Sequence, residues 1–239
     1  MELEKTDMNF SIIAENIDIY LDGVLVTFEL VSLSLLFGLV LAVSLAVALT
    51  ISRNPLVTLP IRAFVYFFRG TPLLIQMFLI YYGMGQFEAI KETFIWDYFK
   101  EAHFCALFTF ALNTGAYTTE IFRGAIVNTP SGEIEAAKAS GMSQALMYRR
   151  IILPSSFRRA LPAYGNEMIF MLHGTALASV ITIVDITGAA RIINSRFYSP
   201  YEAFLTAAIF YMIMTFTMVW VLKKVEFKWL AHLRRSDAS

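Results

Sequence analysis

The amino-acid sequence predicts an all-α protein whose helices cross a membrane five times as one bundle. Hydrophobic residues make up 57% of the 239 positions and charged residues 16%, and the mean hydropathy is +0.61. Soluble domains are about 45–50% apolar and about 25% charged. The apolar residues also gather in blocks of about 20, the length that a helix needs to cross a bilayer. A single transmembrane domain is therefore expected over residues 24–222.

The first predicted span, residues 24–50, is the cleanest. The segment before it, residues 1–23, begins with acidic side chains and lacks the pattern of a cleavable signal peptide, so the first span is expected to stay in the mature protein as a signal anchor. Residues 1–23 themselves are expected to form an external, periplasmic segment. The second span contains Pro72, which is expected to kink its helix. The spans after the first are residues 61–83, 104–121, 164–184 and 203–222.

The basic residues predict the orientation of the chain. Most of the lysines and arginines lie in the connections after the first and third spans and in the tail, residues 223–239. Cytoplasmic segments of membrane proteins are enriched in lysine and arginine. The N-terminus is therefore expected outside and the C-terminus in the cytoplasm. The longest connection, residues 122–163, is then cytoplasmic as well.

This connection has the pattern of two short helices joined by a glycine turn. Pro130 is acceptable in the first turn of a helix, and acidic residues follow it, where the helix dipole favours them. Gly141 then permits a sharp turn with positive φ. A second short helix is expected over residues 143–150, and Pro154 is expected to end it.

Seven residues in this connection form a spaced motif: Glu135, Ala136, Ala137, Gly141, Ile151, Leu153 and Pro154. The pattern E-A-A-x3-G-x9-I-x-L-P resembles the signature loop in the membrane subunits of bacterial ABC importers. The resemblance implies a type I ABC importer-like permease fold, in which this loop docks into a groove of a cytoplasmic ATPase. Small alanine side chains would let the partner approach closely. The alternative is an amphipathic loop that only connects two spans.

The sequence lacks the common motifs for nucleotide binding, catalysis and metal binding, which argues against those functions for this chain. There is no G-x-x-x-x-G-K-[ST] phosphate loop, so ATP and Mg²⁺ are expected in a partner ATPase and no cofactor in this chain. The three histidines are scattered, Cys105 has no base nearby, and neither H-E-x-x-H nor G-x-S-x-G occurs, so no catalytic or metal site is expected. The net charge of zero argues against a nucleic-acid partner.

Four further stretches narrow the family. Residues 69–76 (RGTPLLIQ) and 116–124 (AYTTEIFRG) resemble segments of polar amino-acid importers. Residues 159–167 and 185–191 resemble the M-type subunit of arginine/ornithine and histidine systems. The resemblance covers residues 23–233. It implies a bacterial inner-membrane complex that imports basic amino acids such as arginine, ornithine, histidine or lysine.

The resemblance also implies the partners of the chain. These are an ATPase dimer, a periplasmic solute-binding protein and a second membrane subunit, expected as a heterodimer with a homodimer as the alternative. Other polar amino acids or opines are alternative cargoes. An ion-coupled secondary transporter is the competing transport class, but such folds usually have internal repeats over more spans. A membrane-embedded enzyme or a structural scaffold would leave the loop motif unexplained.

Polar and ionisable side chains inside the spans are the candidate contacts for the substrate. Glu167 is the best candidate, because a carboxylate would offset the dehydration of a cationic amino acid. Its alternative role is a structural ion pair with Arg158 or Arg159. His173 lies on the same span and is more often a packing residue. The other candidates in the substrate pathway are Asn166, Thr71 and Gln76.

Several other charged residues have simpler structural interpretations. Glu120 is expected to pair with Arg123, which follows three residues later on the same helix. Arg69 is expected to extend its aliphatic stem along apolar surface toward the interface. Asp185 is expected to end the fourth span at the outer surface, where it would pair with Arg191.

Overall fold

The computed structural model describes residues 9–229, and within that range the chain is helical and contains no strand, which confirms the all-α class. The long helices are α2 (Ile17–Ile51), α3 (Pro55–Gly70), α7 (Ala102–Val127), α10 (Leu153–Gly174), α11 (Ile186–Phe197) and α12 (Pro200–Trp229). The short helices and turns are α1 (Ser11–Glu15), α4 (Leu73–Tyr81), η1 (Met84–Gln86), α5 (Glu88–Lys91), α6 (Trp96–Phe99), α8 (Ser131–Ala139), α9 (Gln144–Met147), η2 (Tyr148–Ile152) and η3 (Thr175–Ile181).

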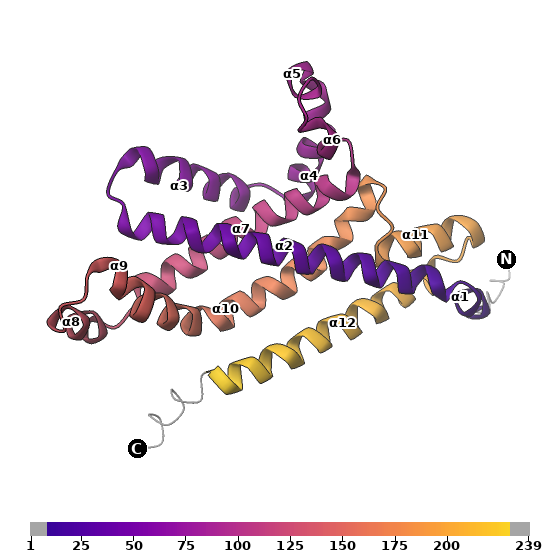
Figure 1. Cartoon of the computed structure of the whole chain (residues 1–239). Coiled ribbons are helices and arrows are strands. Elements are labelled where there is room, and N and C mark those ends of the chain that lie inside the picture. The colour runs from indigo at the N-terminus through magenta and orange to yellow at the C-terminus, as the bar shows by residue number, and fades with distance from the viewer. Residues whose placement is uncertain (1–8, 230–239) are drawn as a thin grey trace.

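The long helices lie side by side along one direction, and the termini of the described chain point to opposite ends (Figure 1). The α2–α3 turn, the α8–α9 connection and the C-terminal end of α12 lie toward one end of the bundle. The helices α1 and α11 lie toward the other end. The predicted docking loop and the C-terminal end of the last helix therefore share one side of the bundle.

Close contact between α2 and α7 forms the centre of the bundle. The residues that α2 buries are spaced about one turn apart and are mostly small, including Gly23, Thr27, Ser34, Gly38, Ala42 and Ala46. A Cβ atom at Gly38 would lie 2.4 Å from Cγ2 of Thr114 on α7, so only glycine permits this approach. Small residues at such positions are typical of helices that pack inside membranes.

The second predicted span is broken rather than continuous. The helix α3 and the segment Leu73–Gln86 meet at an angle of 109°. Thr71 is extended, with φ −119° and ψ 146°, because a residue before proline is disfavoured in the helical region. Pro72 lacks the N–H that would continue the helix. The kink expected at Pro72 is therefore a complete break between two helices.

A buried polar network satisfies the carbonyl groups that this break exposes. Nε2 of Gln76 donates to the carbonyl oxygens of Phe68 (2.8 Å) and Thr71 (2.9 Å). Its Oε1 accepts from Nδ2 of Asn113 on α7, at 2.9 Å. Backbone groups without partners cost several kcal/mol in a bilayer. Gln76 and Asn113 thus hold the broken span against α7.

The loop between η3 and α11 differs from the expectation at Asp185. This residue is fully buried, and its carboxylate accepts from the N–H of Gly188 (2.8 Å) and from the hydroxyl of Tyr211 (2.8 Å). Nη1 of Arg191 donates to the carbonyl of Ser179 instead, at 2.6 Å. The predicted surface position and the predicted pairing with Arg191 are therefore wrong. The physical reason is that the first turn of α11 needs a side-chain acceptor.

The helices agree with several predicted spans but do not settle their number. Residues 24–50 lie inside α2, 104–121 inside α7 and 203–222 inside α12. Two helices, α2 and α12, are long and apolar enough to cross a bilayer alone, and counting the two bent pairs gives up to four. The polar side chains of α7 lower its hydropathy. The count of five spans stays a prediction.

Two predicted segments extend past the described residues. Residues 1–8 of the predicted external segment lie outside them, and residues 9–23 of that segment include α1 and the start of α2. The predicted basic tail, residues 223–239, begins inside α12, and its part beyond Trp229 lies outside the described residues.

Candidate functional site

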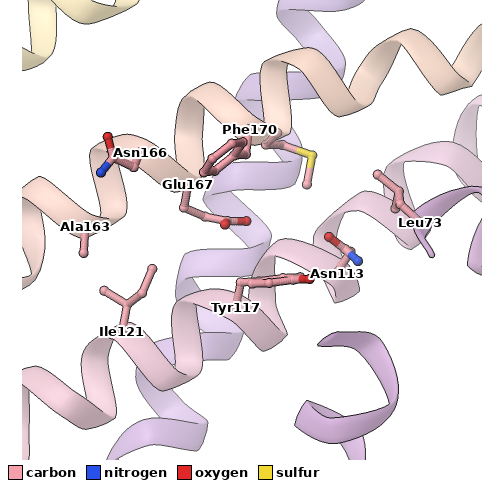
Figure 2. Close-up of a pocket in the computed structure, with 9 residues that line it drawn as sticks. Leu73, Asn113, Tyr117, Ile121, Ala163, Asn166, Glu167 and Phe170 are labelled. Atoms are coloured by element: carbon pink, nitrogen blue, oxygen red, sulfur yellow. The ribbon is translucent and has the colours of Figure 1, made fainter. Parts of the chain in front are cut away.

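An open pocket of about 480 Å³ lies between α7, α10 and the start of α4 (Figure 2). Ligand pockets in proteins commonly measure about 300–1,000 Å³. The pocket is mostly apolar, with a few polar groups that converge on it. It is lined by Leu73, Asn113, Tyr117, Ile121, Ala163, Asn166, Glu167, Phe170 and Met171.

Glu167 is the one residue with a carboxylate among those that line this pocket. Its side chain is 7% exposed and extends from α10 toward the side of the pocket where α7 presents Tyr117 (Figure 2). No ion pair involving Glu167 occurs within residues 9–229. Arg159, an alternative partner, donates instead to the carbonyl of Ala125. A buried carboxylate without an ion-pair partner is costly, and a cationic ligand would offset that cost.

A cation lies next to the pocket on the broken span. Cζ of Arg69 lies 5.3 Å from the ring centroid of Tyr117, a distance typical of a cation–π contact. The hydroxyl of Tyr117 donates to the carbonyl of Arg69 at 3.4 Å. The Arg69 side chain therefore rests on an aromatic ring that also lines the pocket. The pocket thus has a carboxylate on α10 and a guanidinium beside its α7 wall.

The other predicted pathway residues lie in different places. Asn166 lines the pocket together with Glu167. Gln76 does not line the pocket, but it accepts a hydrogen bond from Asn113, which is a lining residue. Thr71 donates to the carbonyl of Phe67 in the helix break. His173 is also outside the lining, and its Nε2 lies 3.1 Å from Oγ1 of Thr215 on α12.

Of the nine lining residues only Asn166 and Glu167 were predicted from the sequence, and the residues missed include Asn113, Tyr117 and Phe170. Asn113 and Tyr117 are four positions apart on α7, so they share one face of that helix with Ile121. On α10, Phe170 follows Asn166 by the same interval. A search for polar and aromatic residues at this spacing in the third and fourth spans could have found this face.

The predicted docking loop forms a compact helical corner. The helix α8 ends in a turn in which Gly141 has φ +70°. The N–H of Met142 donates to the carbonyl of Ala137 (3.1 Å), and the N–H of Gly141 donates to that of Lys138 (2.9 Å). These two bonds define a Schellman motif, whose left-handed residue is usually glycine. The glycine turn and its positive φ are confirmed.

The start of α8 and the role of Pro154 differ from the prediction. Pro130 precedes α8, which begins at Ser131. After α9 the helical path continues through the π turn η2 into α10, and Pro154 lies in the first turn of α10. The expectation that Pro154 ends a helix is wrong. Proline is tolerated in a first turn because that N–H has no helical partner.

The motif residues divide into a buried set and an exposed set. Ala137 is 3% exposed, and Ile151 and Leu153 pack on the same apolar cluster as Ala137. Glu135, Ala136 and Pro154 are exposed. An open groove of about 730 Å³ runs beside them and is lined by residues that include Ala136, Met142, Ile151 and Pro154. The loop therefore combines a rigid base with an accessible surface.

One predicted ion pair lies in the C-terminal part of α7. Nη2 of Arg123 lies 2.7 Å from Oε2 of Glu120. This confirms the structural interpretation of Glu120. Within the described part of the chain, no group of three or more metal-ligating side chains converges.

Comparison with known proteins identifies a matching family over most of the chain. Residues 34–230 match the family described as binding-protein-dependent transport system inner membrane component. The chain is 44% identical over 228 residues to the nopaline transport system permease protein NocM of Agrobacterium fabrum, covering 95% of this chain and 94% of NocM. It is 46% identical over 216 residues to the histidine/lysine/arginine/ornithine transport system permease protein HisM of Escherichia coli, covering 90% of each chain.

A solved structure has the same fold. It is described as an amino acid ABC transporter with histidines, and it superposes on this chain with a TM-score of 0.81 at 31% sequence identity. The match covers 92% of this chain and 98% of the other. The two folds therefore match over nearly the whole length of both chains.

Proposed function

The chain belongs to the family of binding-protein-dependent transport system inner membrane components, and from this premise we propose that it is the pore-forming permease subunit of an ATP-driven amino-acid importer. The family agrees with the one that the loop motif indicates. Such components are non-catalytic membrane subunits, so ATP hydrolysis belongs to another polypeptide. ATP and Mg²⁺ are then held by that partner ATPase.

The chemistry of the pocket favours basic amino acids as cargo. The carboxylate of Glu167 makes no ion pair within residues 9–229 and would pair with the ammonium or guanidinium of a bound side chain. The amides of Asn113 and Asn166 offer neutral hydrogen bonds, and Arg69 is the nearby cation for an α-carboxylate. HisM, whose name lists histidine, lysine, arginine and ornithine, supports the same cargo class. The buried Glu167 is the observation that carries this proposal.

The partners follow from the family and from the exposed surfaces. The groove beside Ala136 and Pro154 is the surface for the ATPase dimer that the loop motif implies. The pocket is open, so a second homologous membrane subunit would close it, in a heterodimer or as a second copy. A periplasmic solute-binding protein would deliver the amino acid at the opposite end of the bundle.

The cargo class is tested by uptake of a labelled amino-acid panel into proteoliposomes that contain the complete complex. Arginine, ornithine, lysine and histidine are expected to enter in an ATP-dependent manner, and neutral or acidic amino acids are not. Nopaline and octopine belong in the panel because NocM and OccM are named for them. Uptake of opines in preference to basic amino acids would show that opines, the alternative cargo, are the substrates.

The expected location is the bacterial inner membrane, with the N-terminus outside and the C-terminus in the cytoplasm. An alkaline-phosphatase fusion after Lys91, in α5, should therefore be active, because the enzyme folds only outside the cytoplasm. A fusion after Lys138, in α8, should be inactive. These two positions lie on different sides in either orientation, so the reverse activities would overturn the orientation and the assignment of the docking loop to the cytoplasm.

A further inference from the structure

Arg159 makes an unusual set of contacts at the corner where the docking loop meets the bundle. Its Nε and Nη2 donate to the carbonyl of Ala125 at 3.3 and 3.1 Å. Nη2 also lies 2.9 Å from Oγ1 of Thr129. On its own helix the guanidinium is held by the hydroxyls of Ser155 and Ser156. One side chain of α10 therefore reaches both the last turn of α7 and the turn that connects α7 to α8.

The acceptors on α7 are groups that need a donor. Ala125 is in the last turn of α7, where carbonyl groups have no helical N–H to bond with. A cation is also favoured at the C-terminal end of a helix dipole. Thr129 is 7% exposed and precedes Pro130 at the start of α8. Arg159 thus supplies charged hydrogen bonds to the corner that carries α8.

The same corner is packed against the bundle by apolar side chains. Ala137 of α8, Phe122 and Ala125 of α7 and Ala160 of α10 belong to one buried cluster. This cluster joins α8 to α7 and α10, but apolar contacts are not directional and alone would allow the helices to slide along one another. The directional hydrogen bonds of Arg159 fix the register between α7 and α10 at this point.

The two helices that the Arg159 contact joins, α7 and α10, also form the walls of the pocket. Ala125 is two helical turns from Tyr117 on α7, and Arg159 is two turns from Glu167 on α10, about 12 Å in both cases at 1.5 Å per residue. A displacement of α8 that is passed rigidly to both helices would therefore reach both walls of the pocket.

We propose that Arg159 is the positioning residue that makes the docking helix α8 move as one body with α7 and α10. The inference rests on the proposed function, since it concerns how motion of the ATPase reaches the cargo pocket. Arginine suits this role because its fixed fork of donors can serve Ala125, Thr129 and Ser155 together. Lysine, with one flexible ammonium group, would keep the charge but only part of the geometry.

The test compares Arg159→Gln, Arg159→Lys and Thr129→Val in reconstituted complexes. We measure the amount of ATPase that co-purifies, the ATP hydrolysis stimulated by loaded binding protein, and the labelled arginine taken up per ATP. Arg159→Gln should retain the ATPase and its hydrolysis but lower uptake per ATP about tenfold, the effect of one lost hydrogen bond to a charged group. The uptake per ATP of Arg159→Lys complexes should lie between that of Arg159→Gln complexes and that of the unmodified complex.

Thr129→Val keeps the side-chain shape and removes the hydroxyl acceptor. Like Arg159→Gln, it should lower uptake per ATP. The double variant of Thr129→Val and Arg159→Gln should have the same uptake per ATP as Arg159→Gln alone. Arg53→Gln, an exposed arginine in the α2–α3 turn, is the matched control and should leave uptake per ATP unchanged. If Arg159→Gln does not accumulate in the membrane, Thr129→Val decides the question by itself.

Three results would overturn the inference. They are normal uptake per ATP in Thr129→Val, an effect of Arg53→Gln equal to that of Arg159→Gln, and loss of the ATPase from Arg159→Gln complexes, which would place Arg159 in the docking surface. Failure of the proposed function is distinguishable, because the unmodified complex would then show no ATP-dependent uptake at all.

Discussion

Replacing Gly141 with valine is expected to leave the chain inserted in the membrane and to reduce ATP-driven uptake at least tenfold. Gly141 has φ +70°, and a β-branched residue in this left-handed region costs about 1–3 kcal/mol. A Cβ atom at this position would meet no atom within 4 Å, so backbone strain and not a clash is the cause. The strain is relieved only by opening the Schellman turn, which displaces α8 relative to α9.

The measurement is ATP hydrolysis and arginine uptake by complexes that carry Gly141→Val, together with the amount of ATPase that co-purifies. The matched control is Gly141→Asn, because asparagine adopts positive φ more readily than other residues. Asparagine should keep most of the activity. Normal stimulated hydrolysis and normal uptake in Gly141→Val would mean that this loop does not couple the ATPase to the bundle.

Replacing Glu167 with glutamine is expected to reduce the maximal rate of arginine uptake by about 100-fold. Removing one partner of a buried charge pair costs about 3–5 kcal/mol, and water in the open pocket would offset part of this loss. Loaded binding protein still docks at the outer end, so the concentration that gives half-maximal uptake should stay the same. The complex should also assemble normally, because Glu167 makes no ion pair within residues 9–229.

The matched control for this prediction is Glu120→Gln, which removes another carboxylate from the inner part of the same bundle. Glu120 already pairs with Arg123, so the change should leave selectivity for basic amino acids intact. Uptake of arginine at the normal rate by Glu167→Gln complexes would show that the counter-ion lies elsewhere, for example in the second membrane subunit.

The sequence predicted those parts of the fold that depend on local composition. Apolar blocks located α2, α7 and α12, and the fixed spacing of glycine in the loop located the turn at Gly141. The break after α3 was only expected as a kink. The full break is accompanied by a hydrogen bond between Gln76 and Asn113, which are far apart in the chain, and no local pattern contains that information.

The errors at Pro154 and Asp185 have the same origin. Proline both ends helices and begins them, and the residues around Pro154 are compatible with either role. The burial of Asp185 depends on Tyr211, which approaches from α12. In both cases the local sequence allows two structures, and the tertiary contacts select one.

The candidate site was predictable in part. Glu167 was identified because an ionisable side chain inside an apolar span is costly and is therefore a candidate functional residue. Asn166 was identified as the polar residue next to it in the sequence. Asn113 and Tyr117 were missed because polar and aromatic side chains in a span are common and only their shared face distinguishes them. Thr71 and Gln76 lie in the network that closes the helix break, so their part in the substrate pathway stays a prediction.

The central claim is that a separate ATPase drives an amino acid through this chain, and ATP-dependent uptake by the purified complex tests it most directly. Proteoliposomes would contain this subunit, its membrane partner and the ATPase, with arginine-loaded binding protein on the side that corresponds to the periplasm. We expect labelled arginine to enter when ATP is supplied to the ATPase side, and not with a non-hydrolysable analogue. Uptake that needs no ATP and follows an imposed proton or sodium gradient would contradict the account and favour an ion-coupled transporter.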